Sequence, residues 1–457
     1  MHLVIIGGSD AGISAALRAR ELAPETDITV ILADEFPNYS ICGLPFFLSG
    51  ETPDAKQLAH RTEFDGIRLL TSHRAVGIEA KRNIVIVQDN KGERHELGYD
   101  QLVIGTGAEP VTPPISGFRI PGVYPLHTME HSFAVKRHLE EKNPRTAAVI
   151  GAGYIGVEMA DALTVRGLEV TLIGKAKAVL PTVDADLGGL VDEEFRRRGV
   201  EVVNETQIHS IKPEGTQLRL IASSGFEKTA DLVVVAVGVK PVTHLAVNAG
   251  IAIGKRGAIR VNRGMKTEFD NIYAAGDCAE TWHRLLNRYT YLPLGTTSHK
   301  QGRVAGENAV GGEREFQGSV GTQVVKVFDL AIARTGLREA EAREAGFDPF
   351  TREVKVWDHK VYYPGAYEMR IRITGDKRSG RVLGAQIVGH WQAQVAKRVD
   401  IFATALFVGM KVDDISDLDL SYTPPLSSPW DPVQIAGQAW SSGAPRDFKG
   451  VAQSSAH

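Results

Sequence analysis

Two copies of one pattern, an apolar strand followed by a glycine-rich turn and a helix, constrain the fold of this chain more than any other feature. In the second copy, the turn from Gly151 to Gly156 follows the apolar residues 148–150 and precedes a predicted helix over 157–166. Its glycines fit every position of the G-x-G-x-x-G fingerprint, which lets the backbone approach a pyrophosphate at a helix N-terminus. The sequence therefore predicts a dinucleotide-binding unit whose contacts are Gly151, Gly153, Tyr154, Ile155 and Gly156.

The first copy of the pattern lies at the N-terminus. A strand over 3–6, a small-residue turn, a helix over 13–22 and a strand over 28–32 follow one another. Ser9 stands where the strict fingerprint has glycine, so this turn alone is a weaker signal. An acidic residue near the end of the second strand usually binds a ribose, and both Asp34 and Glu35 are candidates. Two units predict two dinucleotides, an exchangeable nicotinamide and a bound flavin contacted by Gly7, Gly8, Ser9 and Gly12.

Later strand-and-turn segments support this prediction. Residues 102–107 and 232–238 each join a buried apolar run to small residues, and residues 271–277 end a strand on Asp277, which can hold a ribityl hydroxyl. A helix is predicted over 298–308, and its N-terminus can stabilise negative charge on the flavin pyrimidine ring. The predicted contacts in these segments are Thr106, Gly107, Gly238, Gly276, Asp277, Gly295 and Thr296.

Cys42 follows the first unit, within the stretch 39–47, and is one of two cysteines in 457 residues. Its place before a short predicted helix and beside a flavin predicts a lowered thiol pKa and therefore a reactive thiolate. The alternative is a small buried apolar residue. Cys278 is interpreted as a packing residue. Without a cysteine partner, Cys42 would store oxidising equivalents as a mixed disulfide, a persulfide or a sulfenic acid.

The order of these features resembles the pyridine nucleotide–disulfide oxidoreductases over nearly the whole chain. A single cysteine in place of a C-x4-C pair is similar to the branch that holds coenzyme A disulfide and persulfide reductases and NADH oxidases and peroxidases. The motifs Tyr362-Tyr363-Pro364-Gly365 and Tyr422-Thr423-Pro424-Pro425 favour the coenzyme A group. The resemblance implies a homodimer in which Tyr422 and one of Tyr362 or Tyr363 reach the cysteine of the other subunit.

The resemblance also implies roles near the cofactors and the substrate. Tyr154 would cover the flavin until nicotinamide displaces it, and Glu158 would orient the nicotinamide ring. Many coenzyme A disulfide reductases have serine four residues before the cysteine, where this chain has Asn38. The residues expected near a coenzyme A substrate are Arg18, Arg20, Asn38, Ser40, His60 and Arg61, with solvated surface charges as the alternative interpretation of the basic ones.

The predicted function is that of an FAD-dependent NAD(P)H oxidoreductase in which FAD takes electrons from NAD(P)H and Cys42 delivers them. The substrate would be coenzyme A disulfide, coenzyme A persulfide or a related low-molecular-weight disulfide. One alternative is an NAD(P)H oxidase or peroxidase that uses a sulfenic acid on Cys42. Another is a flavoprotein electron carrier or redox sensor with a protein partner.

The end of the strand over 168–173 predicts the preferred nicotinamide. NADH-binding enzymes usually end this strand on an acidic residue that binds the ribose 2′-hydroxyl. Here the acid is missing and Lys175 and Lys177 follow, so NADPH is expected to serve at least as well as NADH. The alternative is that both lysines are solvated loop charges.

These features predict an α/β fold with two Rossmann-like domains and a C-terminal α+β dimerisation domain. The flavin domain is expected over 1–112 and 249–319, the nicotinamide domain over 113–248, the dimerisation domain over 320–440, and a disordered tail over 441–457. In the C-terminal part, strands are expected over 321–335, 352–362, 369–374 and 382–388, with helices over 338–345 and 392–409.

Composition sets limits on other functions. A formal net charge of −3 gives no overall basicity that would point to nucleic acid. The first residues have no basic region and too short an apolar run for a signal peptide, and the apolar run over 401–410 is too short to span a membrane. We therefore expect a cytoplasmic location. The histidines show no ligand spacing with cysteine, so no metal site is predicted.

Overall fold

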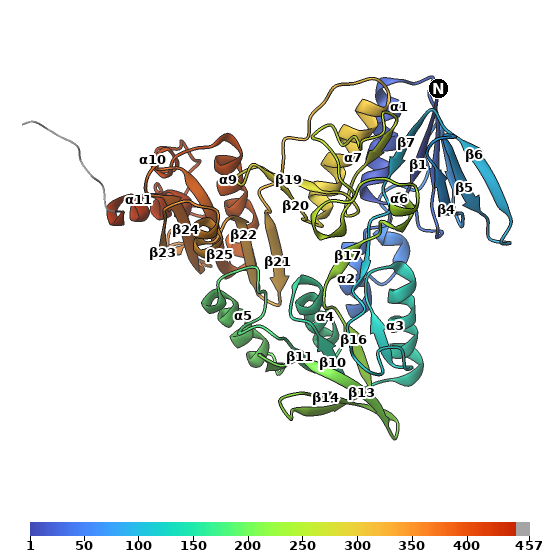
Figure 1. Ribbon diagram of the computed structural model, residues 1–457. Helices are drawn as coiled ribbons and strands as arrows, with labels where there is room; N and C mark the ends of the chain where they lie inside the picture. Colours follow the sequence, from blue (N-terminus) through green and yellow to red (C-terminus); the bar gives the residue numbers. More distant parts are fainter. Residues whose placement is uncertain (445–457) are drawn as a thin grey trace, which may run out of the picture. The chain divides into compact units, whose positions relative to one another are not determined.

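The computed structural model describes residues 1–444. They form two compact units, an N-terminal unit that ends at Ser319 and a C-terminal unit that begins at Val320. Figure 1 shows helices and strands mixed in both units, and each unit is described here by itself. The predicted α/β fold class with a C-terminal α+β domain is confirmed.

The first sheet of the N-terminal unit has the strand order β18-β7-β1-β2-β3, and all its neighbouring strands are parallel. Leu3, Val4 and Ile5 of the central strand are fully buried, as expected for a parallel strand covered on both faces. The sheet joins segments that are far apart in sequence. Its strands are β1 (His2–Ile6), β2 (Asp27–Ile31), β3 (Ile67–Leu70), β7 (Gln101–Ile104) and β18 (Ile272–Ala274).

Two helices, α1 (Asp10–Leu22) and α7 (Gly295–Ala309), lie side by side against this sheet (Figure 1). Their backbones approach so closely that a Cβ atom at Gly302 would overlap the carbonyl group of Ala11, so glycine is needed there. α7 begins three residues before the predicted start at 298, with Gly295 and Thr296 in its first turn. The first turns of both helices border the same end of the sheet, where the strands finish.

A second parallel sheet in this unit has the order β12-β11-β10-β16-β9. The helix α4 (Tyr154–Val165) connects β10 to β11, which reproduces the strand, turn, helix, strand order of the first copy. The apolar run that begins at residue 232 forms a strand only as far as Val235, where β16 ends. The elements are β9 (Val123–Pro125), α3 (Met129–Lys142), β10 (Thr146–Ile150), β11 (Glu169–Ile173), α5 (Ala185–Arg197), β12 (Glu201–Val203) and β16 (Leu232–Val235).

Smaller elements complete the N-terminal unit. Two antiparallel three-stranded sheets stand apart from the parallel sheets, and the strands β8 and β17 pair where the chain passes between the parallel sheets. The remaining elements are η1 (Ile41–Gly43), α2 (Leu44–Ser49), η2 (Ala55–Leu58), β4 (Arg74–Glu79), β5 (Ile84–Gln88), β6 (Arg94–Gly98), β8 (Ala108–Pro110), β13 (Ile208–Glu214), β14 (Gln217–Ala222), β15 (Glu227–Ala230), β17 (Val239–Pro241), α6 (His244–Asn248), η3 (Lys255–Gly257), β19 (Thr281–His283) and β20 (Arg288–Thr290).

The C-terminal unit contains one antiparallel sheet in the order β21-β22-β25-β24-β23. The helix α9 packs against β22 and β25, and α11 packs against β23 and β24. The elements are β21 (Gln323–Val327), β22 (Leu330–Gly336), α8 (Glu339–Glu344), β23 (Pro349–Trp357), β24 (Glu368–Asp376), β25 (Val382–His390), η4 (Trp391–Ala393), α9 (Val395–Val408), α10 (Val412–Ser416) and α11 (Pro432–Gly443).

Two predictions about the C-terminal unit need correction. The strand expected to 362 ends at Trp357, because the chain turns into a loop that carries the two adjacent tyrosines. The expected tail begins inside α11, which runs to Gly443. This helix is capped by Asp431, whose carboxylate accepts the Val433 N–H at 2.9 Å, and it is anchored by the buried Trp440. The rest of that tail, 445–457, lies outside the described residues.

Among the described helices, none is both long enough and apolar enough to cross a membrane.

Candidate functional site

A cavity of about 300 Å³ lies at the carboxyl ends of the strands in the first parallel sheet. This is the edge at which open parallel sheets bind ligands. The cavity is bordered by the first glycine-rich turn, the end of β2, the turn after β7 and the start of α7. Its walls include the predicted residues Gly7, Gly8, Ser9, Asp34, Thr106, Gly107, Gly276 and Asp277.

The first turn fits a dinucleotide although its fingerprint is incomplete. A Cβ atom at Gly12 would overlap the carbonyl oxygen of Gly7, so the turn is as tight as the fingerprint requires. Ser9 has an extended backbone and is the N-cap of α1, a position that serine tolerates. The N–H groups at the start of α1 therefore face the cavity, where they can hold a pyrophosphate.

The two acidic candidates after β2 differ in position. Asp34 lines the cavity, and its carboxylate accepts the Phe36 N–H at 2.9 Å. Burial raises the pKa of Asp34, and the hydrogen bond from Phe36 opposes that rise. Glu35 instead accepts the Ser72 hydroxyl at 3.1 Å and is exposed. Of the two acids, Asp34 is therefore the one that lines this cavity.

Asp277 also lines the cavity and follows the end of β18 after two intervening residues. Its carboxylate accepts the Ser298 hydroxyl at 2.9 Å, and the preceding Gly276 N–H donates to Gln301 at 2.9 Å. The pKa of Asp277 is raised to about 6, chiefly by burial and in part by the charge of Asp10, while the Ser298 hydrogen bond opposes the rise. A carboxylate held this way has a free oxygen for a ribityl hydroxyl. These contacts connect Asp277 to the first turns of α7, which begins at Gly295.

Cys42 lies in η1, directly before α2, and the residue is exposed. The lowered thiol pKa predicted from the sequence is wrong. Loss of hydration has the largest effect and raises the pKa of Cys42, and the charges of Asp10, Glu158 and Asp277 raise it further. The surroundings are acidic, and the short helix α2 contributes too little positive potential at its N-terminus to offset them.

Cys278 has a different environment. It is fully buried, and its Sγ atom donates to the carbonyl oxygens of Ile104 and Ala275, both at 3.4 Å. Both cysteines are free thiols. This arrangement agrees with the interpretation of Cys278 as a packing residue and leaves Cys42 as the accessible thiol.

The second glycine-rich turn presents open space to a ligand. A Cβ atom at Gly153, the N-cap of α4, would meet no atom within 4 Å. The hydroxyl of Tyr154 accepts a hydrogen bond from Thr182 at 3.3 Å. Lys175 and Lys177 follow β11 and are exposed. The turn therefore fits a pyrophosphate, and the lysines lie after the strand whose end contacts the ribose in such units.

Glu158, one turn into α4, is half-buried. The pKa of Glu158 is raised to about 7, chiefly by loss of hydration and in part by the charge of Asp161. Because the folded pKa lies above the ordinary value of 4.5, the protonated form stabilises the fold at low pH and this contribution is lost as the pH rises through about 7.

We therefore expect Glu158→Gln to flatten the pH dependence of stability. Between about pH 5 and pH 8 the wild-type free energy of unfolding should fall by an extra amount on the order of 2 kcal/mol relative to the variant. Thermal unfolding at several pH values measures the difference. The exposed carboxyl Glu141 supplies the control variant Glu141→Gln, and equal pH profiles for all three proteins would contradict the expectation.

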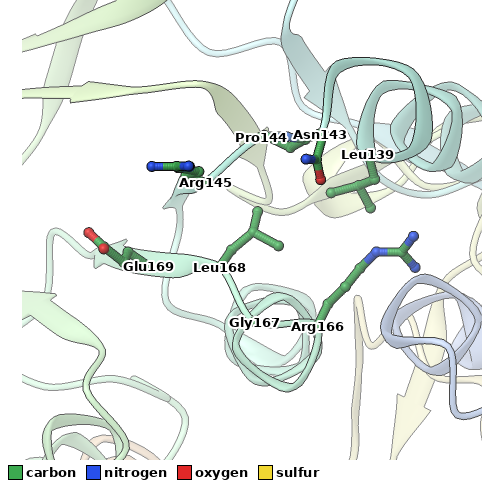
Figure 2. Close-up of a pocket in the computed structure, with 8 residues that line it drawn as sticks. All are labelled: Leu139, Asn143, Pro144, Arg145, Arg166, Gly167, Leu168 and Glu169. Carbon is green, nitrogen blue, oxygen red and sulfur yellow. The ribbon is translucent and has the colours of Figure 1, made fainter.

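A second cavity has a volume of about 430 Å³ (Figure 2). It is formed where α3 and α4 end and where β10 and β11 begin. Figure 2 shows the guanidinium groups of Arg145 and Arg166 at opposite sides of the pocket. Arg166 donates to the carbonyl oxygen of Leu48 at 3.1 Å. Because parallel sheets bind ligands at their carboxyl ends and this cavity is at the amino ends, we assign it no part in the site.

The expected substrate residues divide into two groups. Arg18 pairs with Glu21 and Glu307, at 2.9 and 2.8 Å, and Arg20 donates to the carbonyl oxygens of Pro24 and Gly66. Both guanidinium groups thus have partners within the protein, and this argues against the expectation that they bind the phosphates of coenzyme A.

The other group lies beside the Cys42 stretch. The Asn38 amide donates to the Arg61 carbonyl at 3.1 Å, and the His60 N–H donates to the Asn38 carbonyl at 3.2 Å. Ser40 is held by a hydrogen bond from its N–H to Leu58. Asn38 has a φ of 57°, a left-handed backbone that asparagine adopts more readily than serine, which gives a local reason for asparagine here.

The tyrosines lie on the surface of the C-terminal unit. The hydroxyl groups of Tyr362 and Tyr422 are hydrogen-bonded to each other, and this bond raises the pKa of Tyr362. Tyr363 instead packs edge-on against His359, with ring centroids 5.9 Å apart. The structure thus distinguishes two adjacent tyrosines that the sequence left equivalent.

Some residues of the cavity were not predicted. Asp10 and Ser298 line it, as do His127 and Thr128 at the start of α3. Asp10 occupies a variable position of the fingerprint, and the other three lie outside any motif. Their placement follows from packing of distant segments, so local sequence carried no signal for them.

Two family models match the chain. The model described as pyridine nucleotide-disulphide oxidoreductase matches residues 1–302, and the model of the corresponding dimerisation domain matches residues 322–432. The chain belongs to the pyridine nucleotide-disulphide oxidoreductase family. Membership implies an enzyme that uses FAD and NAD(P)H, and both glycine-rich turns fit such groups. The resemblance drawn from the sequence is confirmed.

This oxidoreductase is similar to proteins of several named activities. An NAD(P)H sulfur oxidoreductase (CoA-dependent) from Pyrococcus furiosus is 37% identical over 437 residues, 95% of this chain and 97% of the relative. An NADH oxidase from Methanocaldococcus jannaschii is 33% identical over 444 residues, 96% and 98% of the two chains. The structure of an NAD-dependent persulfide reductase from A. fulgidus gives a TM-score of 0.92 with 39% identity, covering 96% of this chain and 82% of that chain.

Proposed function

We propose that this protein is an FAD-dependent NAD(P)H oxidoreductase that reduces coenzyme A disulfide, coenzyme A persulfide or a related low-molecular-weight disulfide through Cys42. The arrangement of the two thiols carries this conclusion. Cys42 is exposed and lies within the electrostatic reach of the cavity acids Asp10 and Asp277, whereas Cys278 is fully buried. A single accessible thiol has to use the substrate sulfur as its redox partner.

Bound FAD would accept a hydride from NAD(P)H and pass two electrons on. Around it, the first turn and Asp34 would hold the adenosine and pyrophosphate end, and Asp277 the ribityl chain. The Cys42 thiolate would attack one sulfur of a disulfide R–S–S–R, forming Cys42–S–S–R and releasing the thiolate RS⁻. Two electrons then break the mixed disulfide, restore the Cys42 thiolate and release a second RS⁻.

A tyrosine pair would protonate the released thiolate. We assign this role to Tyr422 and Tyr362, because their hydroxyl groups share a hydrogen bond and both side chains are exposed. Tyr363 is the less favoured candidate, since its ring packs on His359. By analogy with the family, the tyrosines of one subunit would complete the Cys42 site of the other.

A homodimer is part of this proposal. The C-terminal unit matches a dimerisation domain model and exposes large apolar side chains, among them Val361, Val408, Leu426 and Trp430. The proposed domains are a flavin domain over 1–112 and 249–319, a nicotinamide domain over 113–248 and a dimerisation domain over 320–440. Gel filtration giving a monomer would contradict the shared site.

The second candidate function is that of an NAD(P)H oxidase or peroxidase, and the similarity of the chain to an NADH oxidase favours it. The mass of the adduct on Cys42 in protein as isolated separates the two. An increment equal to coenzyme A supports disulfide or persulfide reduction. Oxygen increments alone support the sulfenic acid of an oxidase or peroxidase.

We also propose a preference for NADPH, supported by Lys175 and Lys177 after a strand without a terminal acid. Charge reversal at both lysines should lower kcat/KM for NADPH about tenfold and change the value for NADH less than about twofold, because NADH lacks the 2′-phosphate. Steady-state rates with each nucleotide measure this. The control is Lys212→Glu, an exposed lysine on β13. Equal losses for both nucleotides would contradict the preference.

A further inference from the structure

A buried positive charge in the C-terminal unit belongs to none of the predicted motifs. Arg398, in the first turn of α9, is 4% exposed. Its guanidinium group donates to the carbonyl oxygens of Ala393 at 2.6 Å and Asp358 at 2.7 Å, and to the carboxylate of Asp431 at 3.1 Å. Burying a charge is costly unless it is paired, and two of these partners lie beside the segments that carry the tyrosine motifs.

The first of these partners, Asp358, closes the loop that carries Tyr362, residues 358–367. The Asp358 N–H donates to the Tyr367 carbonyl at 3.0 Å, and the Asp358 carboxylate accepts the Tyr367 N–H at 2.8 Å. These two bonds join the ends of the loop. Because Arg398 donates to the Asp358 carbonyl, it anchors the base of the loop to α9.

The second partner, Asp431, is the N-cap of α11 and follows the segment that carries Tyr422. The carboxylate oxygen that accepts Arg398 also accepts the Ser427 hydroxyl, at 2.8 Å. Within the segment, the Ser427 N–H donates to the Thr423 carbonyl at 3.0 Å. The chain of hydrogen bonds that begins at Arg398 thus reaches the residue next to Tyr422.

The two segments also contact each other directly. The Lys360 N–H donates to the Pro424 carbonyl at 3.3 Å. These residues lie two positions before Tyr362 and two positions after Tyr422, whose hydroxyl groups are hydrogen-bonded to each other. Because the two tyrosine side chains are 74% and 45% exposed, little packing within one subunit orients their rings. Their contact therefore depends on how the backbones of the two segments are held.

We propose that Arg398 is a positioning residue that holds residues 358–367 and 422–427 together so that Tyr362 and Tyr422 meet. The inference rests on the proposed function, in which this pair protonates the released thiolate. Arginine is suited to this role because its planar guanidinium presents several N–H donors in a fixed fork, whereas lysine presents a single point of charge. Replacement by lysine keeps the charge but cannot keep all three contacts.

The first measurement follows the tyrosine pair without any disulfide substrate. The FAD-loaded enzyme is labelled with 3-fluorotyrosine, and the variants Tyr362→Phe and Tyr422→Phe assign the two ¹⁹F resonances. In the wild type, the hydrogen bond to Tyr422 raises the pKa of Tyr362. A pH titration of the Tyr362 resonance in Arg398→Lys should show this pKa lowered toward the ordinary tyrosine value, because the pair no longer meets.

The second measurement is turnover. Arg398→Lys should lower kcat for disulfide reduction about tenfold and leave flavin reduction by NADPH within about twofold of the wild-type rate, because a misplaced acid slows only the step that it serves. In the Tyr362→Phe background, the same change should cause no further loss. The matched control is Arg334→Lys, which alters a buried arginine of the same unit that pairs with Glu341 at 2.9 Å. It should lower stability but leave kcat within about threefold.

Ser427→Ala is a milder variant for the case that Arg398→Lys does not fold. It removes one link between Asp431 and the Tyr422 segment, so it should shift the pKa of Tyr362 in the same direction. An unchanged pKa of Tyr362 in whichever variant folds, or an equal loss of kcat with and without the Tyr362 hydroxyl, would overturn the inference. If Tyr362→Phe alone leaves kcat unchanged, the proposed role of the tyrosines is wrong, while the ¹⁹F titration still decides whether Arg398 positions them.

Discussion

Cys42→Ser is expected to abolish disulfide and persulfide reduction while reduction of the flavin by NADPH continues. The serine hydroxyl ionises far less readily than a thiol and cannot form a disulfide, so the loss should exceed about 1,000-fold. Stopped-flow reduction of the flavin measures the retained half-reaction, and steady-state thiol release measures the lost one. The nicotinamide turn at Gly151 to Gly156 is untouched by the change, which is why the first half-reaction should survive.

The second cysteine provides the matched control for this experiment. Cys278→Ala removes a thiol that is fully buried and hydrogen-bonded to the carbonyl groups of Ile104 and Ala275. The rate of substrate turnover should therefore stay within about threefold of the wild-type rate. If Cys42→Ser retains disulfide reduction, the proposed function is wrong. Electron transfer from that variant to a protein partner would then favour the alternative function of a flavoprotein electron carrier or redox sensor.

Loss of the Tyr362 and Tyr422 hydroxyl groups is expected to have the second largest effect. A positioned general acid contributes on the order of 10² in rate, so Tyr422→Phe and Tyr362→Phe should each lower kcat by about 10- to 100-fold. The two hydroxyls share one hydrogen bond, so the double variant should be little worse than the poorer single variant.

Tyr363→Phe is the control for the tyrosine pair. It changes the adjacent residue in the same loop but removes a hydroxyl that takes no part in the bond between Tyr362 and Tyr422. We expect a change in kcat of less than about threefold. The measurement is steady-state turnover with coenzyme A disulfide at saturating NADPH. A larger loss in Tyr363→Phe than in Tyr362→Phe would reverse the assignment of roles.

The raised pKa of Cys42 shows where a sequence argument went wrong. A thiol before a helix and beside a flavin suggested a stabilised thiolate. In the structure, the charges that influence it are Asp10, Glu158 and Asp277, which come from three separate elements. The sequence distance between them hides this acidic surrounding, whereas the sign of a pKa shift depends on which charges meet in space.

The sequence by itself determined the two dinucleotide units, because each is a local pattern in which strand, turn and helix are contiguous. It also identified Cys42 and the two tyrosine motifs. The tertiary structure decided that Asp34 rather than Glu35 lines the cavity and that Tyr362 rather than Tyr363 pairs with Tyr422. These choices depend on side-chain direction and on packing between segments far apart in the chain, neither of which is encoded in any short run of residues.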